Sequence, residues 1–358
     1  MGAGREVPSV YRLPYFLIPS KCPISGELML RISKIGVTII VTLYTIPLIT
    51  WLLLRWWHGE SWTSVGVMNA IGVWWFVPLL LLLPIALLLR ARQALVMLFI
   101  LLLPALYLFG AEYVPHFWLN VPEDARSIRV LSFNMLSSNV AYDAVIELIR
   151  EQEPDIIAMQ ELSVGMSIAL NENLADIYPY QEVYAWNDPR GMGIWSRYPL
   201  TEGPWRTDHA WERWVHSAIV DIEGQPLFLF NVHLWPTGTL DKEQFARALM
   251  IQEEQAQELN TLISESEIPV LVVGDFNSSP TNETHAILDQ ELDDAWRQVG
   301  FGPGFTFPAP GTFNSWVPRF LRIDYFWTKG SITPLKVQVL SESAGSDHLP
   351  LLGEFAIE

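Results

Sequence analysis

The chain has 358 residues, half of them hydrophobic, and its formal net charge at pH 7 is −17. This length accommodates one domain of ordinary size together with a further segment. The acidic balance argues against a protein that holds long nucleic acid, because such proteins neutralise several phosphates with Lys and Arg. The only cysteine is Cys22, so the chain has no intramolecular disulfide partner and no thiol nucleophile elsewhere.

Three runs near the N-terminus contain almost no charge: residues 35–54, 65–89 and 94–111. Each is close to the ~20 residues that a helix needs to cross a bilayer. A signal peptide is the alternative for the first run, but two further runs of the same kind would not follow one. We therefore predict three transmembrane helices within residues 35–111, which contact the lipid bilayer directly.

The basic residues of this region predict its orientation. Five precede the first run, only Arg55 lies between the first two runs, and Arg90 and Arg92 occupy the link between the second and the third. The positive-inside rule then places residues 1–34 and the second link in the cytoplasm. After three crossings, the rest of the chain is expected outside the cytoplasmic membrane. Residues 1–111 carry a net charge of +5 and the remainder carries −22, so this outer part is strongly acidic.

Residues 112–358 are predicted to form a linker followed by a domain. Residues 112–127 contain two prolines and mixed charge, which is typical of a linker. From residue 128 to residue 358, apolar runs alternate with helical patterns, which indicates sheet packed on sheet with helices outside. Helices are predicted at 141–150, at 241–264 and, shorter, after Pro280; strands are predicted at 128–133, 156–159, 193–196, 217–222, 227–231, 270–273, 323–327, 337–340 and 351–355.

The segment 270–280 joins a buried strand to a polar turn. Four apolar residues are followed by Gly274, Asp275 and Asn277. If the backbone stays extended, Asp275 and Asn277 point to the same side, and their oxygens suit Mg²⁺ or Mn²⁺. Asp and Asn also form ordinary turns after strands, and this segment alone does not decide between the two interpretations.

Other polar residues recur at the ends of predicted strands. One such residue is unremarkable, but their joint occurrence in this order resembles one known group of proteins. The matching segments are Ser132-Phe133-Asn134, Met159-Gln160-Glu161, Gly193 to Pro199, Asn231-Val232-His233-Leu234, Gly274-Asp275-Phe276-Asn277, Arg322-Ile323-Asp324-Tyr325 and Ser346-Asp347-His348. From about residue 128 onwards the chain resembles the endonuclease/exonuclease/phosphatase superfamily, which includes DNase I-like nucleases, neutral sphingomyelinases and inositol polyphosphate 5-phosphatases. With its three spans it is similar to the membrane-anchored bacterial members.

The resemblance implies an α/β fold of the DNase I-like type, a four-layer α/β sandwich, here preceded by three transmembrane helices. It also implies that Asn134 and Glu161 hold a divalent metal, Mg²⁺ or Mn²⁺, and that Asp347 lies beside it. Asp275 and Asn277 would position the attacking water or bind a second ion, and both possibilities stay open. A carboxylate and a carbonyl oxygen are suitable ligands for such an ion.

The same resemblance assigns the proton transfers. His348 is the expected general base, and Asp324 is expected to orient its ring and stabilise the imidazolium form. His233 would contact a non-bridging phosphate oxygen or assist the leaving group.

Together these features predict a membrane-anchored, metal-dependent phosphoesterase whose catalytic domain, residues 128–358, lies outside the cytoplasmic membrane. A lipid or small phosphorylated substrate is favoured, because the acidic domain repels a polyanion and the tether keeps the site near lipid head groups. An extracytoplasmic nuclease acting on DNA or RNA is the alternative. An inactive binding module is the second alternative.

Overall fold

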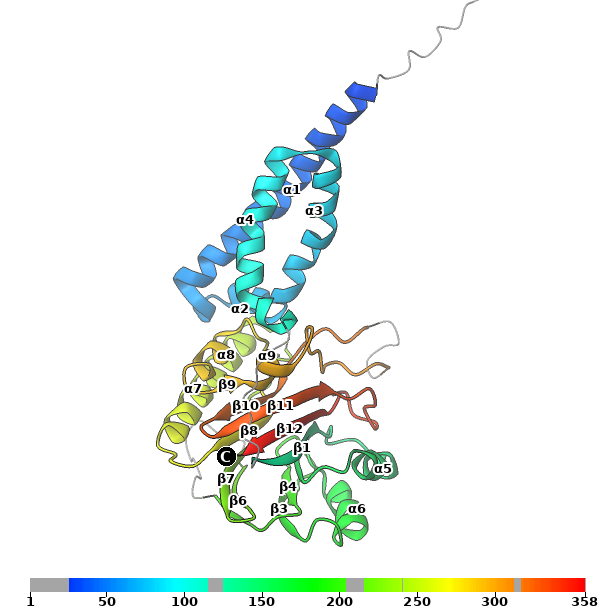
Figure 1. Ribbon diagram of the computed structural model, residues 1–358, viewed down its shortest axis with the longest axis vertical. Helices are drawn as coiled ribbons and strands as arrows, with labels where there is room; N and C mark the ends of the chain where they lie inside the picture. Colours follow the sequence, from blue (N-terminus) through cyan, green and yellow to red (C-terminus); the bar gives the residue numbers. More distant parts are fainter. Residues whose placement is uncertain (1–25, 115–124, 204–215, 240, 312–316, 358) are drawn as a thin grey trace, which may run out of the picture.

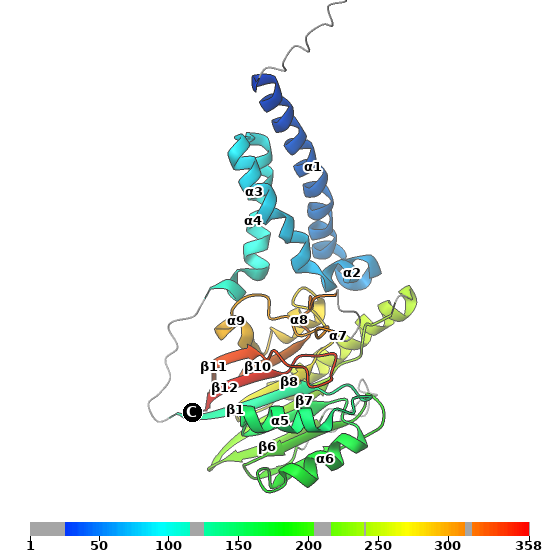
Figure 2. The same cartoon turned by 90° about the vertical axis from the view of Figure 1, so that its right-hand side faces the viewer.

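The computed structural model describes residues 26–114, 125–203, 216–239, 241–311 and 317–357. Within these residues the chain forms a helical region and a region of two packed sheets (Figure 1). The two regions are in contact, and the helical region stands on one side of the sheets in both views (Figures 1 and 2).

The helical region contains α1 (Gly26–His58), α2 (Thr63–Ala70), α3 (Val77–Leu89) and α4 (Arg92–Phe109), joined by the short 3₁₀ segments η1 (Gly59–Ser61), η2 (Gly72–Phe76) and η3 (Gly110–Tyr113). Three stretches are long and apolar enough to cross a membrane: Gly26–Ser61, Gly72–Leu89 and Arg92–Tyr113. Their outward faces expose large apolar side chains such as Leu43, Leu88 and Leu103, which suits contact with lipid.

The second span differs from the prediction, which started it at residue 65. In the structure it starts at Gly72, and residues 63–70 form the separate helix α2, which contacts the sheet region instead. Close to this break, the buried Gly72 lets the chain pass near the sheet region, because a Cβ there would lie 2.3 Å from Thr281 Oγ1.

The sheet region contains two six-stranded sheets, in which β1 pairs with β2 and β7 with β8 in parallel and all other pairs are antiparallel. The first sheet has the order β11 (Ile332–Val339), β12 (Leu351–Ile357), β1 (Arg126–Asn134), β2 (Ile156–Gln160), β4 (Met192–Ser196), β3 (Tyr180–Tyr184). The second has the order β5 (Leu200–Glu202), β6 (His216–Ile222), β7 (Gln225–His233), β8 (Val270–Asp275), β10 (Asp324–Lys329), β9 (Asp293–Asp294).

Apolar side chains from both sheets meet between them, among them Val130, Ile156, Leu229, Leu271 and Phe326. Helices α5 (Tyr142–Gln152) and α6 (Val164–Leu174) pack on the outer face of the first sheet, and α7 (Lys242–Ser264) and α8 (Glu283–Leu288) on that of the second, with α9 (Ala295–Val299) at its edge. The predicted four-layer α/β sandwich is therefore confirmed.

Most predicted elements are present within a few residues of their expected bounds. Asp241 caps α7 as predicted, accepting hydrogen bonds from the backbone N–H groups of Glu243 and Gln244. The prediction missed β3, β5, β9 and α9, which are short, and α6, whose apolar residues follow no clear helical period. It also began β1 at residue 128, whereas the strand starts at Arg126, where it pairs with Ile357 across the sheet.

A buried polar contact joins α2 and η1 to the sheet region. Glu60 Oε1 accepts hydrogen bonds from Asn69 Nδ2 at 2.7 Å and from Asn282 Nδ2 at 2.6 Å. The Asn69 carbonyl in turn accepts from the hydroxyl groups of Ser279, at 3.0 Å, and Thr281. We call this set of five residues the junction.

A second contact lies at the end of α4. The guanidinium of Arg322 is buried between Glu112, at 3.0 Å, and Asp294, at 2.9 Å. Trp74 stacks on Phe305 with ring centroids 5.5 Å apart. Two separate buried contacts therefore fix the orientation of the helical region on the sheets.

Candidate active site

The topology brings the predicted polar residues to one rim of the sandwich. Parallel pairing of β1 with β2 and of β7 with β8 sets their carboxyl ends side by side, so residues at the ends of these strands become neighbours. They border a cavity of about 270 Å³. Six of the eight predicted site residues line it: Glu161, His233, Asp275, Asn277, Asp347 and His348. Asn134 and Asp324 are buried directly behind them.

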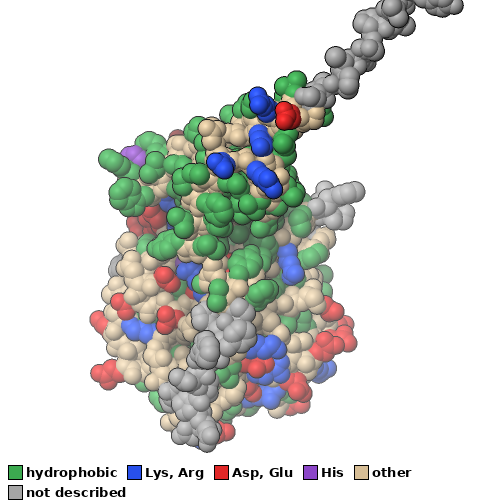
Figure 3. Space-filling model, turned by 45° about the horizontal axis from the view of Figure 1, so that its top comes forward, with side chains coloured by type: hydrophobic (Ala, Val, Ile, Leu, Met, Phe, Trp, Pro, Cys, Tyr) green, Lys and Arg blue, Asp and Glu red, His purple; other side chains and the backbone are tan. Residues whose placement is uncertain are grey.

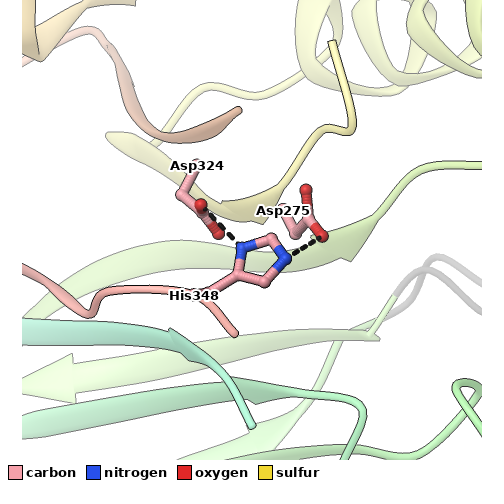
Figure 4. A group of neighbouring side chains, drawn as sticks. All are labelled: Asp275, Asp324 and His348. Atoms are coloured by element: carbon pink, nitrogen blue, oxygen red, sulfur yellow. Dashed lines mark hydrogen bonds and ion pairs between the residues drawn. The ribbon is translucent and has the colours of Figure 1, made fainter. Parts of the chain in front are cut away.

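His348 lies between two carboxylates (Figure 4). Its Nδ1 is 2.9 Å from Asp324 Oδ2, and its Nε2 is 3.7 Å from Asp275 Oδ2. Asp324 is the first residue of β10 and pairs with Asp275 of β8, so the two carboxylates are held in register by the sheet. An Nδ1–H that donates to Asp324 fixes the ring tautomer and leaves Nε2 facing the cavity.

The carboxylates also control the protonation of the cluster. Burial lowers the pKa of His348, but the charges of Asp324 and Asp275 outweigh it and raise this pKa to about 10. Burial and the charge of Asp324 raise the pKa of Asp275 to about 7, against the opposing effect of His348. Burial likewise raises the pKa of the half-buried Asp347. Several carboxylates thus lie close together around one imidazole, and a bound cation would relieve the repulsion between them.

Asn134 does not present the oxygen that the sequence analysis expected. Its Nδ2 donates to Asp275 Oδ2 at 2.9 Å and to Glu161 Oε1 at 3.3 Å, while its Oδ1 accepts from the backbone N–H of Leu136 at 3.0 Å. To bind an ion through Oδ1 the amide would have to turn over and lose the Leu136 bond. The predicted role of Asn134 as a metal ligand therefore stays a prediction, whereas its position between two carboxylates is clear.

Glu161 follows β2 in the left-handed region, with φ at 52°. This costs backbone energy for a residue other than glycine, and such strain tends to be stored at functional sites. The backbone N–H of Ser137 donates to its Oε2 at 3.2 Å, which holds the carboxylate beside the cavity.

The backbone does not stay extended across 275–277, so the condition under which Asp275 and Asn277 would point to the same side is not met. Asn277 has φ at 49°, and its backbone N–H turns back to Asp275 Oδ1 at 2.8 Å. Its Nδ2 donates to the Leu234 carbonyl at 3.1 Å and to Asp275 Oδ2 at 3.3 Å. Just before this turn, β8 passes close to β7 at Gly274, where a Cβ would lie 2.0 Å from the Val232 carbonyl oxygen. Asn277 therefore supports the Asp275 carboxylate as a donor.

His233 completes the rim opposite His348. Its Nδ1 is 3.1 Å from the Pro189 carbonyl oxygen, and its Nε2 lies 3.8 Å from Glu161 Oε1 and 3.7 Å from Asp275 Oδ2. A ring that donates from Nδ1 to a carbonyl has a fixed tautomer, so its Nε2 is directed at the carboxylates.

The donor set suits a hard divalent ion, because Glu161, Asp275 and Asp347 bring carboxylates to one cavity. A tighter group also exists, in which donor atoms of Asp275, Asp324 and His348 lie within 4.8 Å of one another. We favour Glu161 and Asp347 as ligands. The ring nitrogen of His348 nearest Asp324 is already hydrogen-bonded, and magnesium prefers oxygen ligands.

Two parts of the site were not predicted from the sequence. Below it, Gln160 Nε2 donates to Asn231 Oδ1 at 2.7 Å and so links the two sheets. Above it, Ala70 of α2 forms part of the cavity wall together with Phe307 and Leu321. Gln160 and Asn231 stand in the quoted motifs, which was a usable signal. Ala70 lies in a predicted membrane span, and no sequence signal connects it with a site about 200 residues away.

Comparison with known proteins identifies relatives of the sheet region. The model of the "Endonuclease/Exonuclease/phosphatase family" matches residues 131–348, more than half of the chain. One similar solved structure is D. rerio TDP2 complexed with single strand DNA product, which is 18% identical, covers 64% of this chain and 98% of its own, and has a TM-score of 0.53. Another is truncated Caenorhabditis elegans TDP2, which is 18% identical, covers 64% of this chain and 97% of its own, and has a TM-score of 0.51. A functionally unknown conserved protein from Enterococcus faecalis is also similar, with 19% identity, coverage of 64% of this chain and 100% of its own, and a TM-score of 0.50. At these identities the likeness concerns the fold. The search of curated proteins gave no match.

Proposed function

The chain belongs to the endonuclease/exonuclease/phosphatase family, a superfamily of metal-dependent phosphoesterases and nucleases, and from this premise we propose that it hydrolyses a phosphate ester of a membrane lipid or small molecule. The proposal includes three transmembrane helices in residues 35–111, a linker to about residue 127 and a catalytic domain that lies outside the cytoplasmic membrane. The cavity carries the proposal, because it combines a polar floor with an apolar wall that includes a residue of the membrane region.

The wall of the cavity supports a lipid substrate. Ala70 belongs to α2, which connects the first and second spans, and Phe245 and Leu249 of α7 stand beside it. Trp56 and Trp57, at the end of α1 near the sheets, are 83% and 78% exposed, as expected of side chains at a lipid–water interface. A cavity at this level lies within reach of lipid head groups, and its apolar side suits the glycerol and acyl carbons next to the phosphate.

The reaction in this proposal is attack of water on phosphorus, in line with the departing oxygen. His348 can take the proton of the water only as a neutral ring, and positive charge bound at the neighbouring carboxylates would favour that form by lowering the pKa of the ring. Its Nε2 faces the cavity, and Asp324 holds the ring in the required tautomer and stabilises the imidazolium that forms. The His233 ring is held by the Pro189 carbonyl, and its Nε2 contacts the phosphoryl group or the leaving oxygen.

Glu161 and Asp347 are the residues that we propose as ligands of Mg²⁺ or Mn²⁺, with Asp275 nearby. Such an ion supplies positive charge that offsets the charge developing on the phosphoryl oxygens and the effect of the carboxylates on His348. Asn277 and Asn134 keep the Asp275 carboxylate in place through their N–H groups.

A nuclease is the second candidate, and one observation favours it: the similar D. rerio TDP2 was solved with a single strand DNA product. The net charge of −22 after residue 111 opposes it, since the field of such a domain repels a long polyanion.

The decisive experiment uses the purified, Mg²⁺-loaded full chain with phospholipid vesicles and with plasmid DNA at matched phosphate, and His348→Ala as the blank. We expect histidine-dependent release of a lipid phosphate product and little DNA cleavage. Histidine-dependent cleavage of DNA at physiological salt, without lipid turnover, would replace the lipid proposal by the nuclease.

The orientation has a separate test. A membrane-impermeant thiol reagent should leave Cys22 unlabelled in intact cells and label it after lysis. A Glu342→Cys variant in a Cys22→Ser background should be labelled in intact cells, because Glu342 is an exposed residue of the sheet region. Labelling of Cys22 in intact cells would reverse the proposed topology.

A further inference from the structure

A groove of about 690 Å³ lies at the end of the helical region that is far from the sheets (Figure 1). It runs between α1 and the turn that joins α3 to α4. Its lining is Lys34, Ile35, Thr38, Ile39, Thr42 and Leu43 from α1, and Arg90, Ala91, Arg92 and Gln93 from the turn. The volume falls within the range of about 300–1,000 Å³ typical of pockets for small ligands.

One rim of this groove is strongly basic. Lys34, Arg90 and Arg92 border it, and Figure 3 shows Lys and Arg side chains gathered at this end of the helices. Within the described residues, none of the three forms an ion pair. Glu60 and Glu112, two of the three acidic residues described in the helical region, are held in contacts with the sheets at the opposite end. The third, Glu27, lies near the start of α1 and does not line the groove, so within the described residues the lining contains three cations and no acidic side chain.

The rest of the groove is apolar. Ile35, Ile39 and Leu43 are spaced four residues apart along one face of α1 and are 61%, 54% and 69% exposed. The hydroxyl groups of Thr38 and Thr42 donate to backbone carbonyls one turn earlier, so they do not make this face polar. The groove is thus divided into a cationic rim and an apolar floor that continues along the span.

The turn between α3 and α4 keeps two of the cations in place. Arg90 ends α3 in the left-handed conformation, with φ at 53°, where glycine is the favoured residue. The bonds from Arg90 N to the Leu87 carbonyl and from Ala91 N to the Ala86 carbonyl close the turn, and α4 starts at Arg92. Thr42 Oγ1 lies 3.6 Å from Met97 Sδ, which ties α1 to α4 just below the groove.

We propose that this groove binds one anionic glycerophospholipid of the cytoplasmic leaflet. Its phosphate lies against Lys34, Arg90 and Arg92, and one acyl chain lies along Ile35, Ile39 and Leu43. Basic pockets between transmembrane helices on the cytoplasmic side suit anionic head groups in this way. The inference depends on insertion of the helices in a membrane and is independent of the reaction catalysed at the other end of the molecule.

Simple orientation by the positive-inside rule gives a different expectation. It requires basic residues near the membrane surface but no defined place for them, so every cation at this end would attract anionic lipid alike. Arg31 provides the comparison, because it is an exposed residue of α1 at the same end and does not line the groove.

The test is native mass spectrometry of the full chain purified in detergent, with phosphatidylglycerol and phosphatidylethanolamine supplied in equal amounts. The wild-type chain should retain one phosphatidylglycerol in preference to phosphatidylethanolamine. In K34Q/R90Q/R92Q its affinity should fall on the order of 100-fold, from about fivefold for each cation near an anionic surface. In Arg31→Gln the affinity for phosphatidylglycerol should fall no more than about fivefold, the effect of one cation near the surface.

Three outcomes would overturn the proposal: equal retention of phosphatidylglycerol by the triple variant, an equal loss in Arg31→Gln, or displacement of the lipid by millimolar inorganic phosphate. The last would mean that the cations bind a phosphate alone. Unchanged hydrolysis of a soluble phosphodiester by the triple variant shows that the chain is folded, because none of the three cations lies near the catalytic cavity.

Discussion

The candidate active site and the junction are two buried polar sets built from similar side chains. In the junction, Glu60 Oε1 receives two amide donors and the Asn69 backbone carbonyl receives two hydroxyl donors, while Glu60 Oε2 has no partner among the described residues. In the candidate active site, the carboxylates of Asp275 and Asp324 lie on either side of one imidazole, and Asp275 borders the cavity. Hydrogen bonds between donors and acceptors, as in the junction, hold two regions together. A set with excess like charge remains ready to take a cation and move a proton.

The largest expected difference between the two sets concerns catalysis. His348→Ala removes the ring that Asp324 orients, and we expect hydrolysis to fall by about 10²–10⁴, the usual contribution of a positioned acid or base. The thermal unfolding midpoint should also fall, because the ring is buried and Asp324 loses its buried partner, so activity is compared well below the midpoint of the variant. The measurement is kcat with a soluble phosphodiester at saturating Mg²⁺. Activity within threefold of the wild type would exclude His348 from the proton transfer.

The second prediction concerns the ion. Glu161→Gln should weaken binding of Mg²⁺ or Mn²⁺ by tenfold or more in isothermal titration calorimetry, because a neutral amide is a poorer ligand than a carboxylate. Treatment of the wild type with a chelator should abolish hydrolysis, and added Mg²⁺ should restore it. Asp293→Asn, at an exposed acidic residue far from the cavity, is the matched control. Equal ion affinity in Glu161→Gln and the control would remove Glu161 from the ligand set.

The third prediction concerns the junction and is a stability effect. Glu60→Ala leaves the side-chain amides of Asn69 and Asn282 buried without an acceptor, at a cost of about 1–3 kcal/mol for each. We expect a lower unfolding midpoint for the full chain in detergent, while the affinity for Mg²⁺ is retained. Glu254→Ala, at an exposed position of α7, should be nearly neutral. If both variants unfold alike, the junction contributes little to holding the two regions together.

The smallest effect is a pH dependence beside the junction. Burial and the charges of Glu283 and Glu60 raise the pKa of Glu253 to about 7 from 4.5. Between these values the folded chain binds a proton that the unfolded chain has released, so stability falls as pH rises from about 5 to about 7. Glu253→Gln should flatten this slope and raise the unfolding midpoint at pH 7.5. A slope unchanged in Glu253→Gln would assign the pH dependence to other groups.

Much of the fold could be read from local patterns. The three apolar runs, the strands that carry the motifs and the Asp241 cap all follow from periodicity and residue type over short distances. The strands that were not predicted, β3, β5 and β9, lie at sheet edges, where short and half-exposed strands carry no strong pattern.

The candidate site was predicted as a set of residues, and the structure brings all eight of them together at one rim. The orientations of their side chains could not be predicted from the sequence. The orientation of the Asn134 amide depends on the Leu136 N–H and on a carboxylate from β8, and the turn at Asn277 depends on how closely Gly274 approaches β7. These are contacts between strands that pair only in the folded chain.

By itself the sequence determined the three apolar spans, the acidic domain and the order of motifs, because each of these depends only on residue types over short stretches of the chain. Only the tertiary structure decided that α2 leaves the second span, that Ala70 forms a wall of the catalytic cavity and that Lys34 meets Arg90 and Arg92 in one groove. The physical reason is the same in each case. Contacts between residues far apart in the chain depend on which faces pack together, and local hydrophobicity and charge do not specify that choice.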